Sequence, residues 1–139
     1  MSEFSVQWFE GRQVAVYTIA GRPEPGASAA HMEEARRQGI DLELWELGQA
    51  DLARWDYHTA RESTTLWRRY YGPGIRVALR VQSRQDFATA HVVKAVVETE
   101  QLGVDFEVFS DVTAALKWLV SAAPPVGTST IPAPDFTDD

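Results

Sequence analysis

The sequence predicts an α/β domain in which helices cover a mixed, mostly parallel sheet, in the order β-β-α-β-α-β-α-β-α. Three observations favour this fold class. Two segments rich in β-branched and aromatic residues flank Glu10-Gly11-Arg12, as the strands of a hairpin do. The dense aliphatic run IRVALRVQ at 75–82 is typical of a strand covered on both faces. The stretch FSDVTAALKWLV at 109–120 begins with capping residues and then spaces its apolar residues as a helix does.

The first third of the chain is predicted to hold the hairpin and one short helix. The strands of the hairpin are FSVQWF and residues 13–20. After the loop GRPEPGAS, Ser28 is a good N-cap for a helix that contains Met32 and ends at Gly39. The glutamates and arginines of MEEARR in this helix are interpreted as ion pairs on its surface.

A strand at 40–47 and a helix at 58–71 are predicted next. Asp41, Glu43 and Trp45 alternate along one side of the strand, so we expect that side to be partly wet. No second group beside these carboxylates indicates a raised pKa or acid–base chemistry. One face of the helix carries residues spaced at i, i+4, i+7 and i+11, namely Thr59, Ser63, Leu66 and Tyr70.

The remaining elements are two strand–helix units: strands at 75–82 and 104–109, and helices at 84–101 and 111–121. The first of these helices has an apolar stripe formed by Ala88, Val92, Val93 and Val96. In the second, Ser110 or Asp111 is the expected N-cap. Its sheet-facing stripe consists of Val112, Ala115, Leu116 and Leu119.

The chain length and the distribution of proline indicate one domain and a tail. A chain of 139 residues is one domain by the usual prior of roughly 100–200 residues. We assign residues 1–121 to this domain. Residues 122–139 are Pro-rich with an acidic end, a composition that predicts disorder.

Composition excludes several classes of function. The chain has no Cys, which removes disulfides, thiolate zinc sites and a Cys nucleophile. The net charge of −7 argues against nucleic-acid binding, although residues 54–84 carry seven Arg and two acids, a local charge of +5. No apolar run approaches the ~18–20 residues that span a bilayer, and the first ten residues lack the pattern of a secretory signal. A cytoplasmic protein is therefore expected.

Four motifs resemble those of a known family. A strand that begins Arg-Val-Ala at 76–78 leads to a helix, a short strand ends in Val-Phe, and Ala-Leu-Lys-Trp-Leu at 115–119 lies in the capped helix that follows. RWDYHTA at 54–60 resembles a Trp-Asp entry to the second helix. On these motifs the chain resembles the STAS-like, SpoIIAA-like family over roughly residues 40–120, and more loosely over 4–120.

The resemblance implies a fold similar to that of bacterial anti-sigma-factor antagonists and of Sec14-type lipid-exchange domains. Antagonist-type STAS proteins have an Asp-Ser-Ser-Gly-like turn after the third strand, where a serine is phosphorylated. The matching stretch here, WELGQADLARWDYHTARES, has no such turn, and Thr59 is its nearest hydroxyl. We therefore do not expect a phospho-switch at this point.

No catalytic or metal-binding set is found in the sequence. His31, His58 and His91 have no partner at metal-ligand spacing. There is no Gly-x-Ser-x-Gly elbow, and the Gly-Pro-Gly at 72–74 lacks the Lys-Ser/Thr of a phosphate loop. We expect no cofactor, no metal and no enzymatic activity.

One cluster of arginine and aromatic residues is a candidate binding site. Its members are Arg54, Trp55, Tyr57, Arg61, Trp67, Arg68 and Tyr71. Arginine binds carboxylates or phosphates in a bidentate manner and stacks on aromatic rings, so the cluster suits an anionic ligand, a lipid head group or an acidic partner. The alternative interpretation is that the arginines pair with this chain's many acids and the aromatic rings are buried against the sheet.

Two functional hypotheses follow. The first is a non-enzymatic STAS-like binding or regulatory module, whose partner is a protein or an anionic or lipid small molecule. The alternative is a small-ligand or lipid carrier with an apolar pocket between helix and sheet, gated by the Trp and Tyr side chains near 55–71. Five Trp, four Tyr and six Phe are many for one core, so a homodimer is also predicted.

Overall fold

The computed structural model describes residues 2–53 and 55–121, so the tail predicted at 122–139 lies outside the described residues. Five strands form one sheet: β1 (Ser2–Phe9), β2 (Arg12–Gly21), β3 (Leu42–Ala50), β4 (Arg76–Arg80) and β5 (Asp105–Phe109). Four helices follow the last four strands in turn: α1 (Pro25–Arg37), α2 (Tyr57–Trp67), α3 (Arg84–Thr99) and α4 (Val112–Val120). The predicted order of elements and the single mixed sheet are confirmed.

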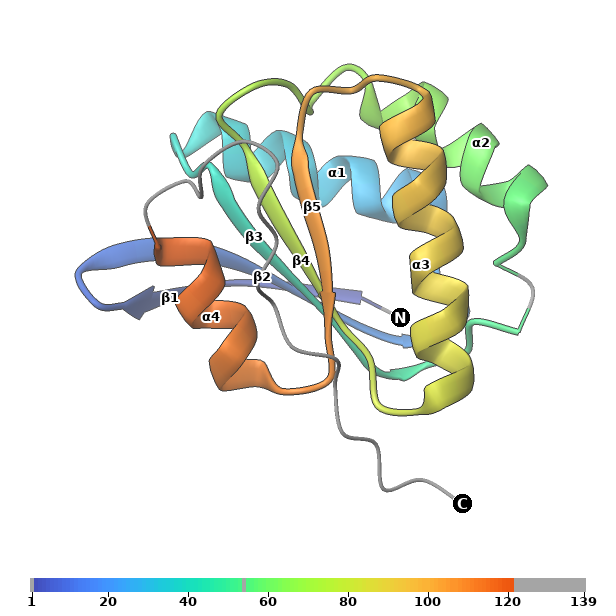
Figure 1. Ribbon diagram of the computed structural model, residues 1–139. Coiled ribbons are helices and arrows are strands. Elements are labelled where there is room, and N and C mark those ends of the chain that lie inside the picture. The colour runs from blue at the N-terminus through green and yellow to red at the C-terminus, as the bar shows by residue number, and fades with distance from the viewer. Residues whose placement is uncertain (1, 54, 122–139) are drawn as a thin grey trace.

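The strands lie in the sheet in chain order, from β1 at one edge to β5 at the other. β1 is antiparallel to β2, and every other neighbouring pair is parallel. Right-handed crossovers that all step in the same direction place their helices on the same face of a sheet. Accordingly α1, α2 and α3 cover one face, whereas α4 follows the last strand and packs on the opposite face (Figure 1).

The interior position predicted for the dense aliphatic run at 75–82 is confirmed. β4 pairs with β3 on one side and β5 on the other, so it is an interior strand. Val77 and Leu79 point toward the three helices, while Ala78 points toward α4. Within the part of the chain that the structure describes, no helix is long and apolar enough to cross a bilayer.

The start of α1 differs from the prediction. Ser28 is not the N-cap, because the helix begins earlier, with Glu24 as N-cap and Pro25 in the first turn. Proline suits this turn because it lacks the N–H that the first turn leaves without a helical partner. The Ser28 hydroxyl instead donates to the Glu24 carbonyl oxygen at 3.3 Å.

The buried stripes of α2 and α3 are rotated relative to the predicted ones. In α2 the buried residues are Ala60, Ser63, Thr64 and Trp67, and the helix ends at Trp67 rather than at 71. Leu66 lies outside this stripe because the larger Trp67 takes the place against the sheet. In α3 the buried residues are Ala90, Val93, Val96 and Val97, and Val92 is 41% exposed.

The predictions for α4 are confirmed. Asp111 is the N-cap, and its carboxylate accepts a hydrogen bond from the Ala114 N–H at 2.8 Å. Ala115, Leu116 and Leu119 are buried, and Val112 packs against them. They close a small apolar cluster with residues of β2, β3, β4 and β5. This helix is therefore the only cover of that face among the described residues.

Candidate functional site

A cavity of about 350 Å³ lies between α1, α2 and the sheet. Arg22, which follows β2, and Asp51, which follows β3, both line it. The Asp51 N–H donates to the Gly21 carbonyl at 2.7 Å and ties the two strand ends together. The carboxyl ends of parallel strands are the usual place for a ligand site in open α/β sheets.

Three tryptophans form the walls of this cavity, one each from β3, from the segment before α2 and from the end of α2. The Trp45 and Trp67 rings lie 5.3 Å apart between centroids with an angle of 73° between their planes. Trp55 meets Trp67 at 6.4 Å and 83°. All three side chains are buried in the core cluster of the three-helix face, so packing holds the walls in place.

The rim of the cavity carries charge of both signs. Glu24 and Asp51 line it together with Arg22. The Asp51 carboxylate accepts from the Ala53 N–H at 3.1 Å. A smaller cavity of about 130 Å³ lies alongside and shares Arg22, Glu24 and Ser28 with the first.

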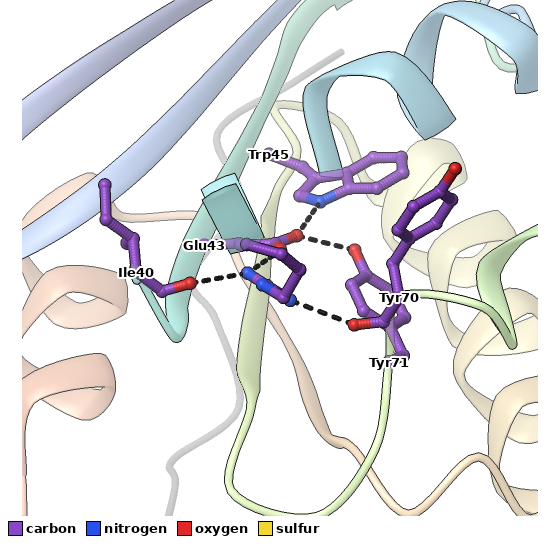
Figure 2. Close-up of polar contacts among 6 residues, drawn as sticks. Ile40, Glu43, Trp45, Tyr70 and Tyr71 are labelled. Atoms are coloured by element: carbon purple, nitrogen blue, oxygen red, sulfur yellow. Dashed lines mark hydrogen bonds and ion pairs between the residues drawn. The ribbon is translucent and has the colours of Figure 1, made fainter. Parts of the chain in front are cut away.

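A buried carboxylate lies behind one of the walls. Glu43 of β3 is fully buried, and its Oε1 accepts from the Tyr71 hydroxyl at 2.6 Å and from Trp45 Nε1 at 3.3 Å (Figure 2). Its Oε2 pairs with Arg36 Nη2 of α1 at 2.5 Å. The same guanidinium donates to the carbonyl oxygens of Ile40 and Tyr70. The expectation that this side of the strand is partly wet is wrong for Glu43 and Trp45, which are buried, while Asp41, just before β3, is exposed.

The environment of Glu43 alters its acidity and that of its neighbours. Burial raises the pKa of the Glu43 carboxyl, while Arg36 and the hydrogen bonds from Tyr71 and Trp45 act in the opposite direction. Burial, and then the charge of Glu43, raises the pKa of Tyr71 and of Tyr17. The sequence indicated no second group beside these carboxylates that raises a pKa, and the raised pKa of Glu43 indeed comes from burial rather than from a neighbouring group.

The arginines of α1 do not all lie on its surface. Arg37 pairs with Glu34 on the exposed side, as the sequence predicts. Arg36 instead turns inward to Glu43, because a buried carboxylate without a partner is costly. The alternation of acids in the strand gave no sign of this contact, since the partner lies in another element.

The predicted arginine–aromatic cluster divides into separate places. Trp55 and Trp67 line the cavity, and Tyr71 belongs to the Glu43 network behind it. Arg61 and Arg68 are not among the residues that line the cavity, and they pair with Glu100, the C-cap of α3, at 3.9 Å and 3.4 Å. Tyr57 is 57% exposed at the start of α2. The seventh predicted residue, Arg54, lies outside the described residues.

Several residues of the site were not predicted from the sequence. From the sequence, Trp45 was assigned to a strand, and Arg22, Glu24 and Asp51 were assigned to loops or to their ends. None of the four was assigned a functional role. Their position just after predicted parallel strands was the available signal, since such strand ends meet at one edge of a sheet. Over residues 2–53 and 55–121, no three His, Cys, Asp or Glu side chains gather as a metal site.

Comparison with known proteins bears on the fold. No protein-family model matches the chain, and no curated protein matches it. Among solved structures, the chain is similar to an uncharacterized protein of the DUF3478 family from Shewanella loihica PV-4, described as having a SpoIIAA-like fold. The two are 18% identical, the match covers 85% of this chain and 93% of the other, and the TM-score is 0.59. The fold that the sequence motifs implied is therefore confirmed: the chain has a SpoIIAA-like α/β fold.

Proposed function

We propose that this protein is a binding module that holds a small, mostly apolar ligand in the cavity between α1, α2 and the sheet, and that it does so without chemical turnover. The observation that carries the proposal is the cavity itself, with its walls of Trp45, Trp55 and Trp67. Concave, mainly apolar sites with a few polar groups at defined positions are the usual form of small-molecule sites.

The size of the cavity limits the ligand. Small-molecule sites span roughly 300–1,000 Å³, so a cavity of about 350 Å³ is at the small end. It suits a compact ligand or a single short chain better than a lipid with two acyl chains. Among the two hypotheses drawn from the sequence, the small-ligand carrier is thus the one that this cavity favours.

Two features support a preformed site. The Trp45 indole is held by its hydrogen bond to Glu43, whose other partners come from α1 and from the segment after α2. The Trp67 Nε1 is buried with no hydrogen-bond partner among the described residues. Such unpartnered buried donors are uncommon in folded proteins, and this one belongs to a side chain that lines the cavity.

Indole N–H signals in a proton–nitrogen NMR spectrum test the proposal directly. On titration with a small apolar probe such as 3,3-dimethylbutan-1-ol, the signals of Trp45, Trp55 and Trp67 should shift. Those of Trp8 and Trp118, which do not line the cavity, should not. Native mass spectrometry of the purified protein is a second readout, in which a co-purifying small molecule favours the carrier.

A matched pair of variants locates the binding. Thr59 lines the cavity, whereas Thr65 is exposed on the other side of α2. Thr59→Phe should fill the cavity and abolish the probe-induced shifts, and Thr65→Phe should leave them unchanged. Equal binding by both variants, or turnover of a substrate in the cavity, would contradict the proposal.

We also propose that the protein forms a homodimer through β1. Within the part of the chain that the structure describes, this strand is an edge of the sheet and pairs only with β2, and Trp8 near its end is 66% exposed. An exposed edge strand offers unpaired backbone groups to a second strand, and two copies of β1 form a self-complementary pair. Sedimentation should show a dimer that Trp8→Glu weakens. A 15.5 kDa species at high micromolar concentration would contradict it.

A further inference from the structure

We propose that a second copy of the chain completes the ligand site: in the homodimer, Trp8 of each copy packs over the smaller cavity of the other. The inference rests on the proposed function, both the cavity and the β1 interface, and adds how the two are connected. Three features support it: the open β1 edge, the face on which Trp8 lies, and the residues at the opposite end of the strand.

In the part of the chain that the structure describes, the β1 edge lacks the usual protection. Natural edge strands are kept from pairing by short length, charges, proline or bulges. β1 has eight residues, pairs with β2 in an unbroken register, and carries one charged residue, Glu3. β5, at the other edge, has five residues, and Glu107 is at its centre. A second β5 paired symmetrically would oppose Glu107 to itself, and like charges directly opposite are destabilising.

The hairpin turn determines which residues of β1 offer their backbone groups to another strand. Residues 10–11 have positive φ, of 50° and 79°, and Phe9 pairs with Arg12, as in a two-residue type I′ turn. The residues that flank such a turn form a hydrogen-bonded pair, and such pairs recur at every second residue of the ladder. The even-numbered residues of β1 therefore point their backbone N–H and C=O groups away from β2.

The same even-numbered residues point their side chains toward the three-helix face. Phe4 and Val6 pack against the core there, and Trp8 follows by alternation. A two-fold axis perpendicular to the sheet keeps this face on one side in both copies, so even-numbered residues oppose even-numbered ones. In the two registers of greatest overlap, Trp8 lies opposite Ser2 or Phe4 of the second copy. Since an indole also reaches diagonal neighbours, it covers this end of the strand in both registers.

That end of the strand borders the smaller cavity. Ser2 lines it together with Ala27 of α1. The Ser2 hydroxyl lies 2.9 Å from His31 Nε2, and the His31 ring stacks on Phe4 with 6.0 Å between centroids. These side chains offer an apolar and aromatic surface to Trp8 of the second copy, which is 66% exposed in the single chain.

Closure of the smaller cavity affects binding in the main one. The two cavities share Arg22, Glu24 and Ser28. A ligand that contacts these residues is more completely removed from water when the second copy is in place. By linkage, the ligand then tightens the dimer by the same factor by which the dimer tightens ligand binding. We expect a factor of about five, the lower end of the usual coupling between two sites.

Single cysteines test the pairing of the strands, since the chain has no cysteine of its own. A disulfide needs Cα atoms about 4.4–6.8 Å apart, which holds for residues directly opposite each other in an antiparallel pair. On mild oxidation, Ser5→Cys should crosslink two copies in the register that places Trp8 opposite Ser2, and Val6→Cys in the other register. Thr18→Cys, exposed on the interior strand β2, should not crosslink. Failure of both β1 variants to crosslink overturns the inference.

NMR spectra of a mixture of isotope-labelled and unlabelled chains locate Trp8, because isotope filters retain only contacts between copies. We expect contacts from the Trp8 indole to the rings of Phe4 and His31. By sedimentation, 3,3-dimethylbutan-1-ol should lower the dissociation constant of the dimer about fivefold. Trp8→Ala should reduce this gain, whereas Gln7→Ala, exposed on the other face of β1, should keep it.

The outcomes separate this inference from the proposed function. If the copies pair through β1 but Trp8 does not contact the second copy, or the probe leaves the dimer unchanged, the inference fails and the homodimer stands. If sedimentation shows only a monomer, the homodimer and the inference fail together, and the indole shifts of Trp45, Trp55 and Trp67 still decide on the cavity. If the probe shifts none of these three signals, ligand binding and the inference both fail.

Discussion

The two faces of the sheet each bury one charged residue, and they compensate its charge by different means. On the three-helix face, Glu43 is satisfied by three side chains, those of Arg36, Tyr71 and Trp45. On the α4 face, Arg76 donates mainly to the end of a helix: its Nη1 reaches the Ser121 carbonyl at 2.7 Å and the Leu119 carbonyl at 3.4 Å. Its guanidinium also lies 4.3 Å from the centre of the Trp118 ring.

The difference shows what each face is built to do. Backbone carbonyls at a helix end need a donor, and Arg76 caps α4 and complements its dipole, so its role is to dock that helix. The partners of Glu43 come from α1, from β3 and from the segment after α2, which are the elements that enclose the cavity. Substitutions on the two faces should therefore separate stability from ligand binding.

The largest effect on stability should come from the α4 face. Leu116→Ala should lower the free energy of unfolding by roughly 2–5 kcal/mol, because it removes buried apolar contacts and leaves a cavity. Ligand binding in the remaining folded protein should be unchanged. Lys117→Ala, at an exposed position of the same helix, should change stability by less than about 0.5 kcal/mol. Equal losses in denaturant midpoints would mean that α4 faces another way.

On the other face, Glu43→Gln should lower stability. It leaves the Arg36 guanidinium without its charged partner, and breaking a buried pair costs about 3–5 kcal/mol. Because the Arg36 side chain is 21% exposed, we expect a smaller loss, of about 2–3 kcal/mol. Urea unfolding measures it, and Glu34→Gln, which changes only surface contacts with Arg37 and Gln38, is the matched control.

A smaller effect is expected for Arg76→Met. Methionine keeps much of the packing against Trp118, but it removes the donors to the last carbonyls of α4. The loss should be about 1–2 kcal/mol, the range of hydrogen bonds from a charged donor after partial relaxation. Thermal unfolding measures the loss. Impaired ligand binding in this variant would show that the two faces are coupled, contrary to the separate roles assigned to them.

The smallest effect concerns pH. His31 stacks on Tyr17 and donates or accepts a hydrogen bond at Ser2 Oγ, and burial lowers its pKa. The unfolded chain, with an ordinary His pKa near ~6.5, then binds the proton more readily than the folded one. Stability should be complete above that value and fall as the pH drops through the folded pKa. Unfolding at pH 7.5 and pH 5.5 should show a weaker pH dependence in His31→Asn than in the unchanged chain.

The ends and the buried side of an element were predicted well where they depend on a local sequence pattern. In α4, the cap and the apolar spacing lie within one short stretch, so the sequence alone identifies the buried side. For α2 and α3 the helices were predicted, but their buried stripes were predicted only in part, at Ser63 in α2 and at Val93 and Val96 in α3. Several apolar residues there allow more than one stripe, and the sheet determines which one is buried. In α2, the packing of Trp67 against Trp45 determines which side of the helix is buried.

The site was predicted only in part, for a physical reason. Trp55 and Trp67 were identified because aromatic residues near arginines stand out in the sequence. Glu43 was interpreted as a wet strand residue because a strand pattern does not reveal a partner such as Arg36 on a neighbouring helix. The rim residues come from different connections, and only the closure of the parallel sheet brings them together.

The order of the strands has a consequence for synthesis on the ribosome. Since the sheet order repeats the chain order, each new strand finds its neighbour already made, and the three-helix face can assemble as the chain emerges. The other face has no cover until α4 is complete. Val14, Leu44 and Ala78 are then exposed for on the order of seconds at a rate of about 5–20 residues per second. That interval is when a nascent chain of this protein most needs a chaperone.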